Sequence, residues 1–184
     1  MRFEEAAPRA LITSIDNVIY SDNKLFGQVG TINPDGSTEY NRKVRSVDSF
    51  SLSEQGIGTS VALRVIYNDL TRLTNSLLKS YNNKVPYSPS PKKFEYSFLH
   101  YTDEQKGHYD WHTDHNTDYA PRTYTIILGL NDDYRGGELK IINDNVNIKL
   151  KKNQAVMFPS NFLFPHKVEP VLLKTRKVLV IWIT

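Results

Sequence analysis

The chain has 184 residues, of which 39% are hydrophobic and 23% are charged. This length corresponds to about one domain of ~100–200 residues, and the composition is typical of a globular protein. The formal net charge of +3 is too small to indicate a nucleic-acid or membrane partner. Because the chain contains no cysteine, disulfides, thiolate metal ligands and cysteine nucleophiles are excluded, and any metal ion must be bound by His, Asp, Glu or backbone oxygen.

The beginning of the chain shows no targeting pattern. The sequence MRFEEAAPRA has acidic residues where a secretory signal has its apolar stretch, and no apolar run approaches the ~18 residues of a membrane span. We therefore expect a cytoplasmic protein without a membrane or nucleic-acid partner. The sequence does not indicate the oligomeric state.

Two helical patterns lie in the first half of the chain. The first has apolar residues at helical offsets, namely Leu11, Ile12, Ile15, Val18 and Ile19. The second predicts an amphipathic helix on a flat surface, with apolar residues at Leu63, Ile66, Leu70, Leu73, Leu77 and Tyr81. Between them, segments 25–31 and 38–47 flank the turn sequence Asn33-Pro34-Asp35-Gly36, which predicts a hairpin.

A proline-rich segment from Val85 to Pro91 cannot continue a helix and divides the chain. After it come eight short β-like runs, which are residues 94–101, 108–112, 123–130, 138–142, 146–150, 155–158, 164–168 and 177–183. Strands this short and evenly spaced favour a sandwich or barrel. We expect an N-terminal helical and hairpin support region over residues 1–92 and a β core over residues 93–184, together forming one compact unit.

The densest polar cluster of the β region contains His112 and Asp114. Residues two apart on a strand point to the same side, so this pair presents an imidazole and a carboxylate together. By itself the pair is more typical of two hydrogen-bonded surface residues than of a metal site. His166 follows the apolar segment 162–165, where an imidazole without a partner is costly. Two His and one Asp can form the facial triad that leaves coordination positions open on Fe(II).

Arg176 stands ten residues after His166 and opens the last apolar run. A guanidinium that faces an apolar barrel wall needs an anion. The dicarboxylate 2-oxoglutarate is a candidate for that anion.

At this point the sequence resembles the Fe(II)/2-oxoglutarate-dependent dioxygenases, and among them the prolyl 4-hydroxylase-like branch. The resemblance covers residues 94–184 well and the N-terminal ninety residues only loosely. It rests on the ordered motifs Tyr101, Gly107, Tyr109, His112-Thr113-Asp114, Gly136-Gly137-Glu138-Leu139, His166, Arg176 and Trp182.

The resemblance implies a mainly β fold with N-terminal helices, of the α+β class, built on a double-stranded β-helix or jelly roll. It implies that His112, Asp114 and His166 bind the iron and that Arg176 binds the distal carboxylate of 2-oxoglutarate. Tyr101 matches a position that reaches this co-substrate, and Trp182 is expected beside it. A second co-substrate tyrosine of close relatives is replaced by Gly129, so Thr123 or Thr125 is expected to contribute to the anchoring instead.

The function implied by the resemblance is hydroxylation, with release of succinate and CO₂. The expected substrate is a prolyl residue in a peptide or protein. A free amino acid or small metabolite is an alternative, and so is a non-catalytic jelly-roll module that has kept the metal site. The implied cofactors are Fe(II), 2-oxoglutarate and O₂, with ascorbate as a further candidate.

Overall fold

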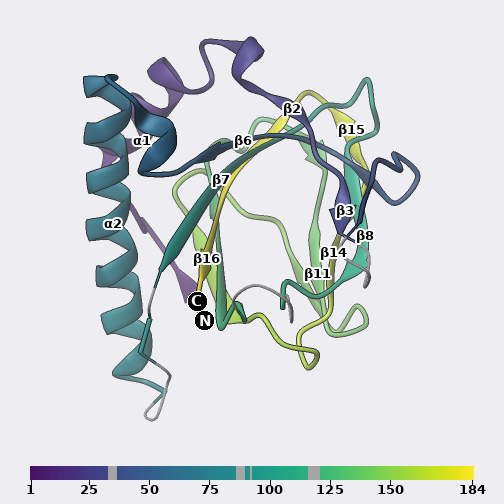
Figure 1. Ribbon diagram of the computed structural model, residues 1–184. Coiled ribbons are helices and arrows are strands. Elements are labelled where there is room, and N and C mark those ends of the chain that lie inside the picture. The colour runs from purple at the N-terminus through teal and green to yellow at the C-terminus, as the bar shows by residue number, and fades with distance from the viewer. Residues whose placement is uncertain (33–36, 86–89, 92, 116–120) are drawn as a thin grey trace.

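The computed structural model describes residues 1–32, 37–85, 90–91, 93–115 and 121–184. Two antiparallel sheets face each other, and the long helix α2 (Val61–Asn82) covers the outer side of the larger sheet (Figure 1). The shorter helix α1 (Arg9–Val18) packs against α2. The other helical elements of the described residues are two 3-10 turns, η1 (Asn23–Leu25) and η2 (Gln55–Ile57).

Both helices form where the apolar periodicity predicts them. In α1, Leu11, Ile12 and Ile15 are buried. Helix α2 begins after Ser60, whose hydroxyl accepts a hydrogen bond from the Leu63 amide and so satisfies one of the free N–H groups of the first turn. Neither helix combines the length and the apolar character that crossing a membrane requires, over the residues that the structure describes.

The strands form two main sheets. The larger sheet has the order β1 (Arg2–Phe3), β13 (Ala155–Pro159), β9 (Tyr124–Gly129), β16 (Arg176–Ile183), β7 (Phe94–Tyr101), β6 (Asp48–Leu52) and β2 (Gly27–Gln28). The smaller sheet has the order β12 (Val146–Ile148), β11 (Leu139–Ile141), β14 (His166–Val168), β8 (His108–His112) and β5 (Arg45–Ser46). Two short pairs lie beside them, β3 (Thr31–Ile32) with β4 (Thr38–Glu39), and β10 (Arg135–Gly136) with β15 (Val171–Leu173).

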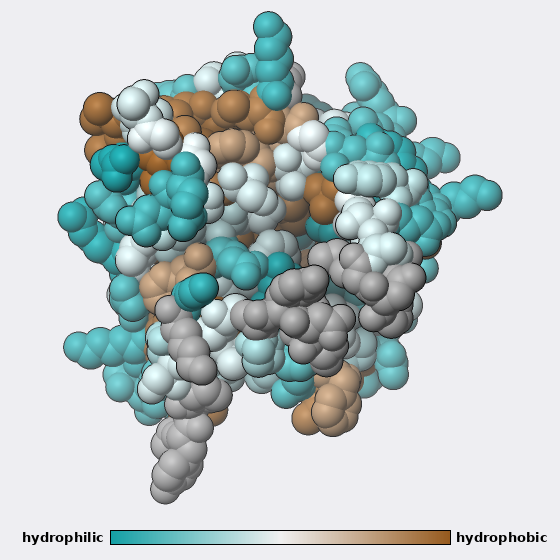
Figure 2. Space-filling model, in the orientation of Figure 1, coloured by the Kyte–Doolittle hydropathy of each residue, from teal (hydrophilic) through white to brown (hydrophobic). Residues whose placement is uncertain are grey.

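The central strands of the larger sheet are buried on both faces. On β9, Ile126 and Leu128 join the cluster under the helices, while Ile127 joins a second cluster between the two sheets. Strand β16 alternates in the same way, so that Arg176, Val178, Val180 and Trp182 share the face toward the smaller sheet. The hydrophobic colour in Figure 2 gathers at the upper left, over the region where α1, the start of α2 and β6 meet in Figure 1.

The structure confirms both helices and places a strand in each of the eight expected runs. It adds β6, which sequence reasoning missed because a five-residue half-buried strand has too little apolar alternation to be recognised. The expected hairpin over 25–31 and 38–47 is reduced to the β3–β4 pair, and its turn at 33–36 lies outside the described residues. The expected boundary between the support region and the β core, between residues 92 and 93, also falls at a position outside the described residues. This boundary therefore stays a prediction.

Candidate metal centre

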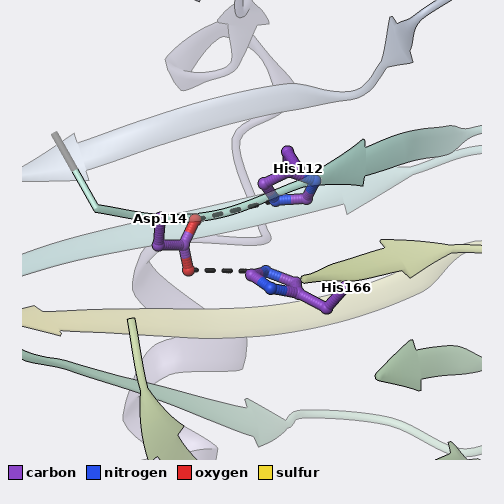
Figure 3. A group of neighbouring side chains, drawn as sticks. All are labelled: His112, Asp114 and His166. Carbon is purple, nitrogen blue, oxygen red and sulfur yellow. Dashed lines mark ion pairs between the residues drawn. The ribbon is translucent and has the colours of Figure 1, made fainter. Parts of the chain in front are cut away.

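Three residues from two neighbouring strands bring their side chains together. His112 ends β8, Asp114 follows two residues later, and His166 begins β14, where it pairs with His112 across the ladder. One ligand atom from each residue lies within 4.8 Å of the others. The carboxylate of Asp114 faces both rings, with His112 Nε2 3.6 Å from Oδ1 and His166 Nε2 3.5 Å from Oδ2 (Figure 3).

The backbone orients both imidazoles. His112 Nδ1 lies 2.7 Å from the Asp110 carbonyl oxygen, and His166 Nδ1 lies 3.1 Å from the Phe164 carbonyl oxygen. A carbonyl oxygen can only accept, so each Nδ1 carries a proton, and Nε2 is the ring atom left for a metal ion in the neutral imidazole. Both Nε2 atoms face Asp114, which is the arrangement needed to bind one divalent cation when the imidazoles are neutral.

The pKa values of the triad reflect a mixture of burial and charge. Burial and the neighbouring His166 imidazole lower the pKa of His112 to about 3. Burial alone would raise the pKa of Asp114, but His166 and the hydrogen bonds that the carboxylate accepts lower it far below its usual range. For His166 burial lowers the pKa and the facing Asp114 carboxylate raises it, with a net increase. One neutral imidazole and one ionised carboxylate are therefore already present without a metal ion.

Asp114 has a buried support that the sequence did not single out in this role. Thr125 Oγ1 donates a hydrogen bond of 2.7 Å to Asp114 Oδ2 and lies 2.9 Å from Ser160 Oγ. Because the Thr125 proton is used on Asp114, the Ser160 hydroxyl donates to Thr125. Both hydroxyl residues are completely buried. Only the folded structure shows this contact, since the three residues come from separate segments.

Arg176 lies inside the barrel with 1% of its surface exposed. It pairs directly with Tyr101 across β16 and β7, and its Cζ lies 5.0 Å from the centroid of the Tyr101 ring. Four buried side-chain nitrogen atoms lack a hydrogen-bond partner within the described residues: Arg176 Nε, Arg176 Nη1, Trp182 Nε1 and Arg45 Nε. All four are donors, and buried donors without acceptors are rare and costly. This group of atoms fits a ligand that carries acceptor oxygens, such as a dicarboxylate.

The other expected co-substrate residues separate into two groups. Trp182 lines the same pocket as Tyr101 and the triad, and the Arg122 guanidinium stacks over its ring at 3.8 Å. Thr123 Oγ1 instead donates to the Ile183 carbonyl oxygen at 2.9 Å and does not line this pocket, so its expected anchoring role has no support in the geometry. At Gly129 a Cβ atom would collide with the Lys151 carbonyl oxygen, so the backbone there leaves no room for a side chain.

The pocket has a further wall, which contains the motif residue Tyr109 and also Arg45, which sequence reasoning missed. Arg45 and Tyr109 line it together with the triad, and the Arg45 Cζ lies 4.4 Å from the centroid of the Tyr109 ring. The remaining lining is aromatic or aliphatic, from Leu99, Tyr101, Ile127, Val168, Val180 and Trp182. No local pattern marks Arg45, because it belongs to a two-residue strand at the edge of the smaller sheet.

Two imidazoles and one carboxylate beside a buried guanidinium, between the sheets of a mainly β fold, define the site of a non-haem iron oxygenase. Residues 96–184 match the family described as the 2OG-Fe(II) oxygenase superfamily. The β core over residues 96–184 belongs to this superfamily, whose members use Fe(II), 2-oxoglutarate and O₂.

The comparisons with individual proteins agree with this family. A PKHD-type hydroxylase from Prochlorococcus marinus is 32% identical over 126 residues, which are 63% of this chain and 56% of that protein. A PKHD-type hydroxylase from Gloeothece citriformis is 41% identical over 63 residues, 33% of this chain and 28% of that protein. The matches therefore span about a quarter to a half of the curated relatives' own length.

Solved structures confirm the jelly-roll fold. A prolyl-4-hydroxylase from Pseudomonas putida superposes with a TM-score of 0.70 at 18% identity, covering 100% of this chain and 90% of that one. A prolyl hydroxylase from Trichoplax adhaerens, solved with a peptide fragment of the hypoxia inducible factor oxygen degradation domain, gives a TM-score of 0.76 at 17% identity. This second match covers 100% of this chain and 82% of that one.

Proposed function

We propose that this protein is an Fe(II)- and 2-oxoglutarate-dependent hydroxylase, and that its substrate is a prolyl residue in a peptide or protein. The observation that carries the proposal is that His112, Asp114 and His166 line one pocket together with Tyr101, whose ring lies beneath the buried guanidinium of Arg176. A metal-binding module without catalysis would not need a buried guanidinium with two free donor nitrogens.

In this proposal each residue has one task. His112 and His166 bind the metal through Nε2, and Asp114 binds through its carboxylate, which Thr125 holds in place. Arg176 pairs with the distal carboxylate of 2-oxoglutarate, while Tyr101 and Trp182 form the walls that exclude water around it. When bound, the iron and 2-oxoglutarate supply the oxidative chemistry, in which O₂ and 2-oxoglutarate yield succinate, CO₂ and a hydroxylated substrate.

Electrostatics support an anionic co-substrate in this pocket. Two neutral imidazoles and one carboxylate leave a net charge of about +1 on a ferrous site. Arg176 adds a second positive charge at a depth where water cannot replace an anion. A 2-oxo acid with a second carboxylate complements both charges at once.

The proposal of a prolyl substrate is based on the related proteins. The structural neighbours include prolyl hydroxylases from a bacterium and an animal, one of them bound to a peptide. The curated relatives carry the more general name of PKHD-type hydroxylases. We include ascorbate as an auxiliary reductant and a cytoplasmic location in the proposal, because the site depends on ferrous iron and on a common metabolite.

The test has two stages. The first is anaerobic titration of the protein with Fe(II) and then 2-oxoglutarate, followed by absorption spectroscopy, which should show a charge-transfer band that His166→Ala abolishes. The second is incubation with proline-containing peptides, with free proline as a parallel substrate, and mass spectrometry for a gain of one oxygen atom matched by succinate. Hydroxylation of free proline alone would show that the substrate is a small molecule and not a peptide. Metal binding without succinate formation under any condition would show that the protein is a non-catalytic binding module.

A further inference from the structure

Three flat groups lie in series beside the metal centre. The ring of Tyr109 stacks on the imidazole of His112, with 3.5 Å between the ring centroids and an angle of 18° between the planes. On Tyr109, in turn, lies the guanidinium of Arg45, 4.4 Å from the ring centroid. The series therefore connects a residue at the edge of the smaller sheet to a candidate metal ligand.

Strand register and the neighbouring hairpin fix the Arg45 end of this series. Arg45 on β5 pairs directly with Tyr109 on β8, so the two side chains leave the sheet on the same face. Arg45 Nη1 donates a hydrogen bond of 3.0 Å to the Gly30 carbonyl oxygen. Gly30 itself lies against Thr38 and Glu39 so closely that a Cβ atom would collide with them, so the acceptor carbonyl is held by the β3–β4 hairpin.

His112 has few other groups to hold its ring plane. Its Nδ1 bonds to the Asp110 carbonyl oxygen, which fixes one point of the ring but leaves rotation about that bond. The His166 ring lies 4.2 Å away at 55°, a tilted contact rather than a stacked one. Metal-bound histidines commonly have such outer partners, and their loss typically lowers metal affinity.

We propose that Arg45 is a positioning residue for the metal centre: it holds the Tyr109 ring, and the Tyr109 ring holds the plane of His112 in the orientation that binds the metal. This inference rests on the proposed metal role of His112. It assigns a function to the N-terminal part of the chain, because Arg45 and its Gly30 partner both lie outside the matched residues 96–184.

Charge and position predict opposite effects of removing Arg45. A guanidinium near a divalent cation repels it, so loss of the charge alone would strengthen metal binding. Loss of the stack frees the His112 ring and weakens metal binding. A decrease in affinity therefore identifies positioning rather than electrostatics.

The experiment measures Ni²⁺ binding by calorimetry, without 2-oxoglutarate, since Ni²⁺ is a redox-stable ion that imidazoles bind well. Arg45→Met removes the charge and the planar group, whereas Arg45→Lys keeps the charge and loses the planar group. Tyr109→Leu removes the ring, and Tyr109→Phe keeps it. Arg122→Met is the matched control, because it also removes a guanidinium that stacks on an aromatic ring at this pocket. This ring belongs to Trp182, which contacts no candidate metal ligand.

We expect Ni²⁺ affinity to fall about tenfold in Tyr109→Leu, at the lower end of the range for partners of metal-bound histidines. In both Arg45 variants we expect a smaller loss of about three- to tenfold, because Arg45 acts on His112 through Tyr109. Tyr109→Phe and Arg122→Met should stay within about twofold of the wild type. A second readout needs no metal: stacking on Tyr109 shifts the His112 ring protons upfield in NMR spectra of the metal-free protein. These shifts should diminish in both Arg45 variants and in Tyr109→Leu, with His112→Gln used for assignment.

Two results would overturn the proposal. One is an unchanged or increased Ni²⁺ affinity in Arg45→Met together with unchanged His112 shifts. The other is an equal loss of affinity in Arg122→Met, which would indicate a general effect of charge or folding. If the wild type bound no Ni²⁺, the proposed metal centre would fail instead, and the ring shifts of the metal-free protein would still decide whether Arg45 orders His112.

Discussion

Arg176 lies directly opposite Tyr101 in the β7–β16 ladder, and its guanidinium lies over the Tyr101 ring. The adjacent Lys177 pairs with His100 and faces the other side of the sheet, where its ammonium lies 4.8 Å from the centroid of the Tyr20 ring. Two neighbouring cations of one strand thus have opposite surroundings. Arg176 is inside the barrel with free donors, and Lys177 is outside it.

This relationship predicts that Arg176→Gln strongly raises the 2-oxoglutarate concentration needed for half-maximal binding. Truncating one partner of a buried charge pair costs on the order of 2–5 kcal/mol, or roughly thirtyfold to several-thousandfold in affinity. Titration of the metal-loaded protein with 2-oxoglutarate measures the effect, and metal affinity without co-substrate should hardly change. Lys177→Gln is the control, and a larger effect of Lys177→Gln than of Arg176→Gln would contradict the inward orientation of Arg176.

Gly137 contacts the Arg176 side chain, and a second prediction follows from this. A Cβ atom at Gly137 would lie 2.8 Å from Arg176 Cδ, so Gly137→Ala should displace the guanidinium and weaken 2-oxoglutarate binding while leaving metal affinity unchanged. Gly137 also has a φ of 67°, where an L-residue is strained by about 1–2 kcal/mol. Gly58→Ala is the matched control, because Gly58 has a φ of 55° and open space around it. Equal 2-oxoglutarate affinities of the two variants would refute the contact argument.

The hydrogen bond from Thr125 to Asp114 predicts a defect in metal binding. Thr125→Val keeps the shape of the side chain but removes the donor, and it leaves Ser160 without its acceptor. Loss of such an outer partner typically lowers metal affinity about 10–100-fold. The control is Thr123→Val, which removes a hydroxyl that bonds only to the Ile183 carbonyl among the described residues. Calorimetric titration with a divalent metal ion compares the two, and a similar affinity in both would exclude the role of Thr125.

The low pKa of His112 predicts how the stability of the metal-free protein depends on pH. The unfolded chain takes up a proton on His112 near pH 6.5, whereas the folded chain does so only near pH 3. Between these values the unfolded state binds more protons, so stability falls as the pH falls, by up to about 1.4 kcal/mol per pH unit for this group. His166 has a raised pKa and contributes in the opposite sense above pH 6.5.

Urea unfolding in the presence of a chelator, at several pH values from 6.5 to 4.5, measures this dependence. The difference in stability between the wild type and His112→Gln should shift in favour of the variant as the pH falls, because the variant has no imidazole to protonate at this position. A difference that stays constant over this interval would show that His112 is not held neutral in the folded protein.

The local chemistry of the site could be predicted from the order of residues alone. His112 and Asp114 share one side because the side-chain period of a strand is two, and the helices are visible because apolar residues recur every three or four positions. Arg176 was recognised as an inward-facing cation because a charge beside a continuous apolar strand must have a reason to be there. These inferences need only the neighbours along the chain.

Contacts between distant segments could not be predicted from the sequence. The hydrogen bond from Thr125 to Asp114, the contact of Gly137 with Arg176 and the series from Arg45 through Tyr109 to His112 each join residues from different strands. Thr125 and Thr123 show the limit well: they share a face of the chain and an identical side chain, yet one supports Asp114 and the other bonds to the backbone. Strand register and the closure of the two sheets decide which hydroxyl reaches the carboxylate, and both arise only from the packing of the whole core.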